Sequence, residues 1–478
     1  MSEPAVSREA PAPSLPAPPA AAPPGRPAGA NPYLRRNLTL LTLDGAFFMA
    51  GSAFYDSGTV LPTLVSTLTS SKALIGLAAA MRTIGWFLPQ LIVASLTEHL
   101  RYKGRLVVVN SLVHRALLLV MAAVIYFHAG TRPGLALALF FPVFVVSCIS
   151  EGVNGVPWTD VVANTIPPDR RGRLFANQQI LGGLWAFGNG FLVRLILNDA
   201  PYPDAYAILF LCTFVAFSLS VLSFMGVREQ PVSEVGGRRS LLDYLGSLPA
   251  AWKGNRDFAR VMVVRFCLAF LFLSVPFFVL HSRENLGADI GTVGLFVSAQ
   301  MLGSLVGSAV AGRISDRTGN RVVVILAVAA SFLAPAVAVL LTAAHSAGAT
   351  ALAMAVFPAV YFFVGWTFGA GYIGFTNYVI DVSPAAQRAT FIGLSNTLMA
   401  PFAFLAAAGG LLATLAGYPA VFLISAFVGA IGVALAFRLP EPRRRQVPLR
   451  SEPAGENDWG PEGVGVAPPK ETSPGGAG

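Results

Sequence analysis

The stretch AYAILFLCTFVAFSLSVLSFMGV, residues 205–227, decides the fold of this chain because it contains no charged side chain. A bilayer core of roughly 30 Å is crossed by about 20 apolar residues in helical form. Hydrocarbon offers the backbone no outside hydrogen-bond partner, so a segment of this kind must be helical. Residues 205–227 therefore predict a transmembrane helix.

Comparable stretches recur along the chain, and residues 45–65 and 417–437 also lack Lys and Arg. The chain is 54% apolar and only 12% charged, whereas a soluble domain carries about 25% charged residues. The sequence predicts an all-α polytopic membrane protein with twelve transmembrane helices in two pseudo-symmetric six-helix bundles. The expected spans are 38–66, 73–97, 105–127, 134–163, 174–198, 204–226, 258–281, 290–312, 321–343, 350–380, 390–416 and 418–438.

The basic residues give the orientation. With the amino terminus inside, the expected outer loops hold Lys72, Arg132 and Arg283, and the spans hold Arg82, Arg115, Arg194 and Arg265. The other Lys and Arg residues fall in the tails, the inner loops and the inner span edges. By the positive-inside rule, both termini of this multi-pass protein are expected in the cytoplasm, with the chain integral to the plasma (cytoplasmic) membrane. The net charge of +9 is therefore expected to meet anionic lipid rather than nucleic acid.

Composition divides the chain into five parts. Residues 1–36 and 439–478 are rich in Pro, Ala and Gly and are expected to be disordered cytoplasmic tails. Between them we expect an N-terminal six-helix bundle at 37–227, a cytoplasmic linker at 228–256 and a C-terminal six-helix bundle at 257–438.

An internal repeat supports this division. The segment Ile75-Gly76-Leu77 corresponds to Val293-Gly294-Leu295 at an offset of 218 residues. The same offset relates Gly85 to Gly303 and Glu98 to Asp316. Duplicated bundles around a shared central site are typical of secondary transporters.

A loop motif carries a family resemblance. Residues 312–321 read GRISDRTGNR, with an acid-Arg pair between two glycines and further basic residues after it. This loop resembles the signature that follows the second helix of each half in the major facilitator superfamily. The first-half copy is degraded to Glu98-His99, and residues 168–173 and 384–388 resemble a second family loop. The resemblance implies that such loops latch the cytoplasmic face, with these gating residues: Glu98, Arg105, Arg171, Gly312, Asp316, Arg317, Gly319, Arg321 and Arg388. The alternative is that these charges only fix the topology.

Charged residues inside the expected spans are the main functional candidates, because charges at this depth are costly and mark functional sites by default. The proton-coupling network is expected to consist of Glu151, Asp44, Asp56, Arg82 and Arg115. A carboxylate that loses an Arg partner between two states changes its proton affinity. Two alternatives stay open: Arg82 and Glu151 form a structural pair, and Asp56, near Gly58 and Pro62, only bends the first helix.

The second half lacks such deep charges, and the repeat aligns Arg82 with Gln300. The family resemblance implies that the first, fourth, seventh and tenth helices line a cavity. The expected substrate contacts, mostly aromatic or amide side chains, are Tyr55, Asn154, Trp158, Trp366, Tyr372 and Asn377. Packing of the helices is the alternative role for these aromatic residues.

The motifs of several other classes are absent from the sequence. It has no phosphate-binding loop of P-loop type, no His-Glu-x-x-His, no Cys-x-x-Cys and no Gly-x-Ser-x-Gly, so we expect no enzyme, cofactor or metal site. The predicted function is secondary active transport of a small organic solute by alternating access, coupled to protons and carried out by a monomer. The alternatives are an amphiphile or lipid flippase and a non-transporting membrane receptor on the same fold.

Overall fold

The computed structural model describes residues 33–97, 100, 102–229, 254–383 and 388–442. Over these residues the regular structure is entirely helical. The predicted tails and most of the predicted linker lie outside the described residues, as does Glu98.

The first half of the chain forms α1–α7 and two short irregular helices. Their bounds are α1 Leu34–Ser52, η1 Ala53–Tyr55, α2 Val60–Leu68, α3 Lys72–Thr97, α4 Gly104–Val124, η2 Ile125–Ala129, α5 Pro133–Thr165, α6 Pro168–Asp199 and α7 Asp204–Met225. The second half forms α10 Arg256–Ala269, η3 Phe270–Leu273, α11 Val275–Glu284, α12 Thr292–Thr318, α13 Asn320–Ser346, α14 Thr350–Val356, α15 Pro358–Val382, α16 Arg388–Met399, η5 Ala400–Phe404 and α17 Leu405–Ala436. Ten described segments are long and apolar enough to cross a membrane.

The first expected span, 38–66, is not one continuous helix. The chain leaves the helical conformation at Asp56, where ψ is 134°, and α2 starts at Val60. The Asp56 carboxylate accepts hydrogen bonds from the Gly58 N–H and the Thr59 hydroxyl, both at 2.9 Å. Short acidic side chains bind nearby backbone groups in this way and compete with the helix. Asp56 therefore marks the break in the first span.

The last two expected spans meet at Gly417, as the sequence predicts. The described helix α17 runs through this position, but Gly417 has a φ of 78° and is not helical. Glycine adopts this left-handed conformation at little cost, and Pro419 two residues later cannot donate a backbone hydrogen bond.

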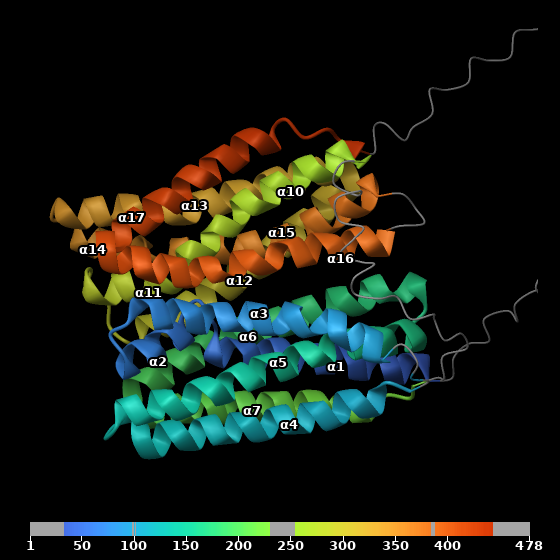
Figure 1. Ribbon diagram of the computed structural model, residues 1–478, viewed down its shortest axis with the longest axis horizontal. Coiled ribbons are helices and arrows are strands. Elements are labelled where there is room, and N and C mark those ends of the chain that lie inside the picture. Colours follow the sequence, from blue (N-terminus) through green and yellow to red (C-terminus); the bar gives the residue numbers. More distant parts are fainter. Residues whose placement is uncertain (1–32, 98–99, 101, 230–253, 384–387, 443–478) are drawn as a thin grey trace, which may run out of the picture.

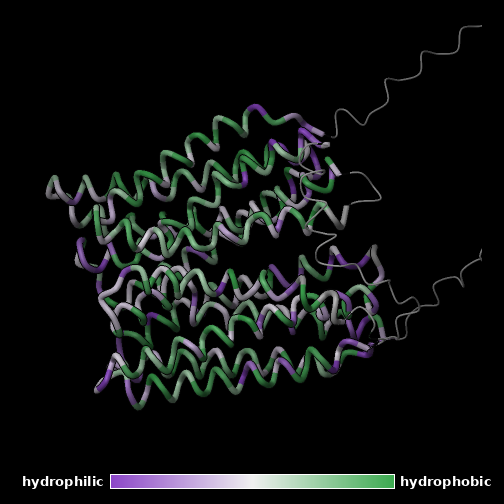
Figure 2. Tube along the Cα trace, viewed as in Figure 1, coloured by the Kyte–Doolittle hydropathy of each residue, from purple (hydrophilic) through white to green (hydrophobic). Residues whose placement is uncertain are grey.

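The helices form two groups that lie one above the other in Figure 1. The first group is α1–α7 and the second is α10–α17. Both ends of the described chain lie at the same end of the array, which we call the terminal end, and the opposite end is the distal end. The ribbons of the two groups diverge toward the terminal end (Figure 1). In Figure 2 apolar residues follow the helices along their lengths, and polar residues gather at both ends.

Glycines bring the two groups into backbone contact toward the distal end. A Cβ on Gly76 of α3 would lie 2.0 Å from the Ala406 carbonyl oxygen of α17. A Cβ on Gly294 of α12 would lie 2.3 Å from the Gly190 carbonyl oxygen of α6. Gly76 and Gly294 are the glycines that the repeat aligns. Small residues let helices approach this closely, so α3–α17 and α6–α12 hold the groups together near this end.

The terminal end repeats one arrangement in both groups. The Glu229 carboxylate accepts the backbone N–H groups of Lys103 and Gly104, each at 2.8 Å, at the start of α4. The Glu441 carboxylate likewise accepts the backbone N–H of Arg321 at 3.0 Å, at the start of α13. A helix amino terminus has free N–H donors and favours a negative charge. In each group, a carboxylate that follows the last helix, α7 or α17, thus binds the start of α4 or α13.

Candidate functional site

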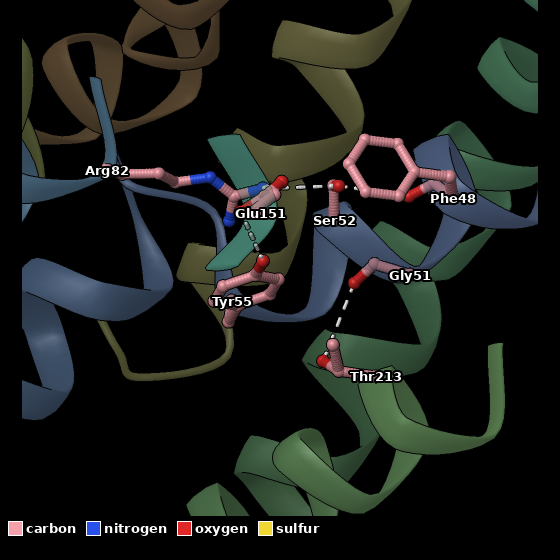
Figure 3. Close-up of polar contacts among 7 residues, drawn as sticks. All are labelled: Phe48, Gly51, Ser52, Tyr55, Arg82, Glu151 and Thr213. Atoms are coloured by element: carbon pink, nitrogen blue, oxygen red, sulfur yellow. Dashed lines mark hydrogen bonds and ion pairs between the residues drawn. The ribbon is translucent and has the colours of Figure 1, made fainter. Parts of the chain in front are cut away.

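A buried ion pair lies inside the first group. Arg82 of α3 and Glu151 of α5 approach to 3.3 Å, with 17% and 8% of their side chains exposed. The Tyr55 hydroxyl donates to the other Glu151 oxygen at 3.3 Å, and Arg82 also donates to the Ser52 hydroxyl at 3.2 Å. The Arg82 guanidinium lies 4.0 Å from the centre of the Tyr55 ring. Figure 3 shows these side chains converging from α1, η1, α3 and α5.

Glycine contacts position the ion pair. A Cβ on Gly152 would lie 2.0 Å from the carbonyl oxygen of Gly85, so the backbones of α3 and α5 touch next to Glu151 and about one turn from Arg82. Burial of either charge alone would be costly. The close approach of α3 and α5 places Arg82 and Glu151 within reach of each other.

A second polar contact joins the two groups of helices. The Gln300 side-chain amide of α12 donates to Asp56 Oδ2 at 3.0 Å. The Tyr361 hydroxyl of α15 donates to the Gly58 carbonyl oxygen at 3.2 Å. Asp56 and Gln300 are 9% and 5% exposed. At the break in the first span, the Asp56 carboxylate and the Gly58 carbonyl oxygen are therefore free to accept hydrogen bonds from the second group of helices.

A cavity of about 210 Å³ lies beside this contact. Its walls come from both groups: Asp56, Ser57, Gly58, Ala79, Ala80, Thr83, Phe272, Val275, Pro276, Gln300, Phe368, Ala403 and Ala406. On α3 the lining residues follow Gly76 in the direction of the terminal end. The cavity therefore lies on the terminal side of the glycine contact between α3 and α17.

Asp44 has a separate set of partners within the first group. Its carboxylate accepts the Trp158 indole N–H at 2.7 Å and the Ser220 hydroxyl at 2.6 Å. The side chain is 6% exposed. Asp44 and Trp158 thus bind each other, and no hydrogen bond described for them joins them to the Arg82–Glu151 pair.

Arg115 donates to backbone carbonyl oxygens and forms no described ion pair with a carboxylate. Its guanidinium donates to the Phe217 carbonyl oxygen of α7 at 2.7 and 3.1 Å and to the Ser111 carbonyl oxygen at 3.1 Å. Within the described part of the chain, Glu151 forms its ion pair with Arg82. These contacts give Arg115 the geometry of a link between α4 and α7.

The predicted substrate contacts are spread over several places. Tyr55 donates a hydrogen bond to Glu151, and Trp158 donates one to Asp44. Asn154 turns to α4, where it bonds Asn110 and Ser111 at 2.9 and 3.0 Å. Asn377 donates to the Ser315 hydroxyl at 3.4 Å near the terminal end of α12.

Trp366 and Tyr372 of α15 differ in their surroundings. The Trp366 ring packs on Phe362, with ring centres 6.1 Å apart, and its backbone meets Gly307 of α12. Tyr372 is 77% exposed. It lies one helical turn after Phe368, so it shares the face of α15 that lines the cavity.

The predicted gating residues gather at the terminal end. Arg105, Asp316 and Arg317 are exposed. Among the residues that the structure describes, none forms a recorded hydrogen bond or ion pair with the Asp316 side chain. Gly312 lies within α12, and Arg171 donates to the carbonyl oxygens of Ile166 and Ala163. Gly319 has a φ of 96° beside Glu441, and Arg321 donates to the Phe437 carbonyl oxygen at 2.6 Å. Arg388 starts α16, but its side chain lies outside the description.

Sequence reasoning did not select Gln300, Phe272 or Phe368 as site residues. One signal was available for Gln300, which is a polar residue deep in an apolar span and is aligned with Arg82 by the repeat. Nothing distinguishes Phe272 and Phe368 from the many other apolar residues of the spans. Among the described residues, no cluster of three or more His, Cys, Asp and Glu side chains is placed to hold a metal ion.

The fold and the buried charges define a polytopic helical membrane protein with a polar centre between two groups of helices. Residues 261–471 match the sequence profile of the Major Facilitator Superfamily. No curated protein matches the chain by sequence. The matched segment contains the loop motif at residues 312–321, so the second half of the chain is similar to this superfamily, as the motif predicts.

Solved structures share the fold at low sequence identity. A D-xylose–proton symporter has a TM-score of 0.64 and 15% identity, over 86% of this chain and 99% of that one. The nucleoside transporter NupG has a TM-score of 0.62 and 15% identity, over 84% and 99%. A bacterial homologue of the iron transporter ferroportin, in its inward-facing state, has a TM-score of 0.60 and 14% identity, over 85% and 99%.

Proposed function

We propose that this protein is a secondary active transporter of a small organic solute that works by alternating access and couples to protons. The observation that carries the proposal is the buried Arg82–Glu151 pair, in the same part of the molecule as a cavity whose walls come from both groups of helices. A solute bound in that cavity contacts both groups, so its binding energy can depend on how they are arranged.

The proposed architecture has twelve spans in two six-helix bundles, at 37–227 and 257–438. Ten described segments qualify as spans by length and composition. The long apolar helix α3 adds one. The segment Phe391–Ala436 supplies two because it breaks at Gly417.

The conformation is proposed to be inward-facing, with both termini in the cytoplasm and the chain in the cytoplasmic membrane. The two groups touch through glycines on the distal side of the cavity, and their ribbons diverge toward the terminal end (Figure 1). The positive-inside rule assigns that end to the cytoplasm. The likeness to a ferroportin homologue in its inward-facing state supports this assignment.

Glu151 is proposed as the proton carrier. One carboxylate oxygen faces Arg82 and the other accepts the Tyr55 hydroxyl. Protonation of Glu151 removes the attraction to Arg82, and movement of α3 relative to α5 then changes the proton affinity of Glu151. The protonation of Glu151 is thereby coupled to the positions of α3 and α5.

Asp316 and the other gating residues are proposed to act in the opposite conformation. Asp316 is exposed here, where the ribbons of the groups diverge. When the terminal end closes, its carboxylate comes within reach of cationic side chains or a helix amino terminus.

The test uses purified protein in proteoliposomes with an imposed pH gradient and a panel of solutes. For one proton per solute, a gradient of about one pH unit supports roughly tenfold accumulation. We expect wild type to accumulate a solute. In Glu151→Gln the gradient should no longer drive accumulation, while exchange of labelled for unlabelled solute continues.

The matched control is Asp257→Asn, which neutralises an exposed pair with Arg260 at the start of α10. Its accumulation should equal that of wild type. Accumulation by Glu151→Gln at the wild-type level would remove Glu151 from the coupling role. Failure of wild type to move any solute or proton would overturn the proposed function itself.

A further inference from the structure

We propose that the central cavity binds a small protonated amine with an apolar body. This inference rests on the proposed transport function and names the class of substrate that the cavity recognises. It rests on three features of the cavity wall: the Asp56 carboxylate, the free side-chain oxygen of Gln300 and the stacked rings of Phe272 and Phe368.

The charge of the cavity wall is negative. Asp56 is the one ionisable residue among its lining residues, and no Lys, Arg or His is among them. Arg82, the nearby cation of the first group, is already paired with Glu151. When Asp56 is ionised, the side chains of Asp56, Arg82 and Glu151 together carry one net negative charge, which a cationic ligand neutralises.

Two oxygen atoms of the wall have capacity for new hydrogen bonds. Asp56 Oδ2 accepts from Gln300, and a carboxylate oxygen has room for a further donor. The side-chain oxygen of Gln300 is buried and has no hydrogen-bond partner. A buried acceptor without a partner is unfavourable. An ammonium group carries donors for both oxygens and has no acceptor of its own.

The rest of the wall suits an apolar body. Phe272 of η3 and Phe368 of α15 lie stacked, with ring centres 6.1 Å apart and an interplanar angle of 25°. Val275, Pro276 and Ala406 add aliphatic surface. Aromatic faces attract cations as well as apolar groups, so these rings favour an organic amine over an inorganic cation.

The amine site also spans the two groups of helices. Asp56 belongs to the first group, and Gln300, Phe272 and Phe368 belong to the second. An amine that binds both Asp56 and Gln300 therefore acts directly on the contact that joins the groups beside the cavity.

The experiment compares three probes of nearly equal shape on the purified full-length protein in nanodiscs. They are 2-phenylethylamine, which is cationic at neutral pH, 2-phenylethanol, which is neutral, and phenylacetate, which is anionic. Binding is measured by calorimetry at fixed pH and ionic strength. We expect 2-phenylethylamine to bind about tenfold or more tightly than 2-phenylethanol, which corresponds to one lost charge-assisted contact. Phenylacetate should bind least.

Variants then assign the binding to the cavity. Asp56→Asn should abolish the preference for the amine over the alcohol. Phe368→Ala should weaken the binding of both the amine and the alcohol. Gln300→Met removes the free oxygen and serves if Asp56→Asn does not fold. Asp257→Asn, far from the cavity wall, should bind like wild type.

Equal binding of the amine and the alcohol by wild type, or tighter binding of phenylacetate, would overturn the inference. So would a preference for the amine that survives both Asp56→Asn and Gln300→Met. Transport of a neutral or anionic solute alongside such a result would leave the proposed transport function intact. Absence of transport for every solute would instead count against the proposed function.

Discussion

The variant Arg82→Ala is expected to be less stable than the double variant Arg82→Ala/Glu151→Ala. Arg82 is the ion-pair partner of Glu151, and the single substitution leaves a buried carboxylate without its cation. Removing one member of a buried pair typically costs about 3–5 kcal/mol, whereas replacing both with apolar residues is often neutral. The double variant should therefore recover much of the lost stability.

The measurement is thermal unfolding of each purified variant, combined with proton-driven transport in proteoliposomes. We expect the double variant to regain stability but to show no coupling. Coupling by a well-folded double variant would mean that the pair is purely structural. A double variant that is less stable than Arg82→Ala would contradict the desolvation cost expected for a lone buried charge.

The variant Gly190→Val is expected to open the distal end. A Cβ at Gly190 would already lie 2.1 Å from the Ser298 hydroxyl oxygen and 2.6 Å from the Gly294 carbonyl oxygen of α12. Overpacking of a well-packed interface typically costs about 1–3 kcal/mol. Because 1.4 kcal/mol is a factor of ten, the population of the conformation with α6 against α12 should fall roughly fivefold to a hundredfold relative to the alternative.

Gly188→Val is the matched control on the same helix. A Cβ at Gly188 has no neighbouring atom within 4 Å, so the substitution changes helix propensity without touching α12. The readout is the distance between spin labels at Asp199→Cys and Asp289→Cys, in a background without the three native cysteines. Gly190→Val should shift this distance to longer values, and Gly188→Val should not. Equal distances in the two variants would mean that the contact between Gly190 and Gly294 does not keep the distal end closed.

Most of the fold follows from apolar length and charge placement. The expected span 204–226 agrees with α7, Asp204–Met225, because the segment is uniformly apolar between charged ends. The boundary at residue 417 was predictable from a glycine followed by Pro419. The break at Asp56 was only one of two alternatives, because a carboxylate that binds its own following backbone has no distinct pattern in an apolar span.

The site was less accessible to sequence reasoning. Depth in the spans singled out Arg82, Glu151 and Asp56, because charges are rare there. Depth alone did not decide between Arg82 and Arg115 as the partner of Glu151, so both were expected in one network, whereas Arg115 donates to the Phe217 carbonyl oxygen. The contact between Asp56 and Gln300 depends on how the two groups of helices meet, which no local pattern encodes. For the same reason Phe272 and Phe368 were not distinguished from other apolar residues.

The central claim is that the two groups of helices, which contact each other through Gly190 of α6 and Gly294 of α12, tilt against each other during transport. The most direct measurement places spin labels at both ends of this helix pair, at Asp199→Cys with Asp289→Cys and at Arg173→Cys with Arg313→Cys. Distances are recorded in nanodiscs at several pH values, with and without a transported solute. The account predicts that the distance between residues 173 and 313 shortens under the conditions that lengthen the distance between residues 199 and 289. Two distances that stay constant, or that change in the same direction, under conditions of active transport would contradict it.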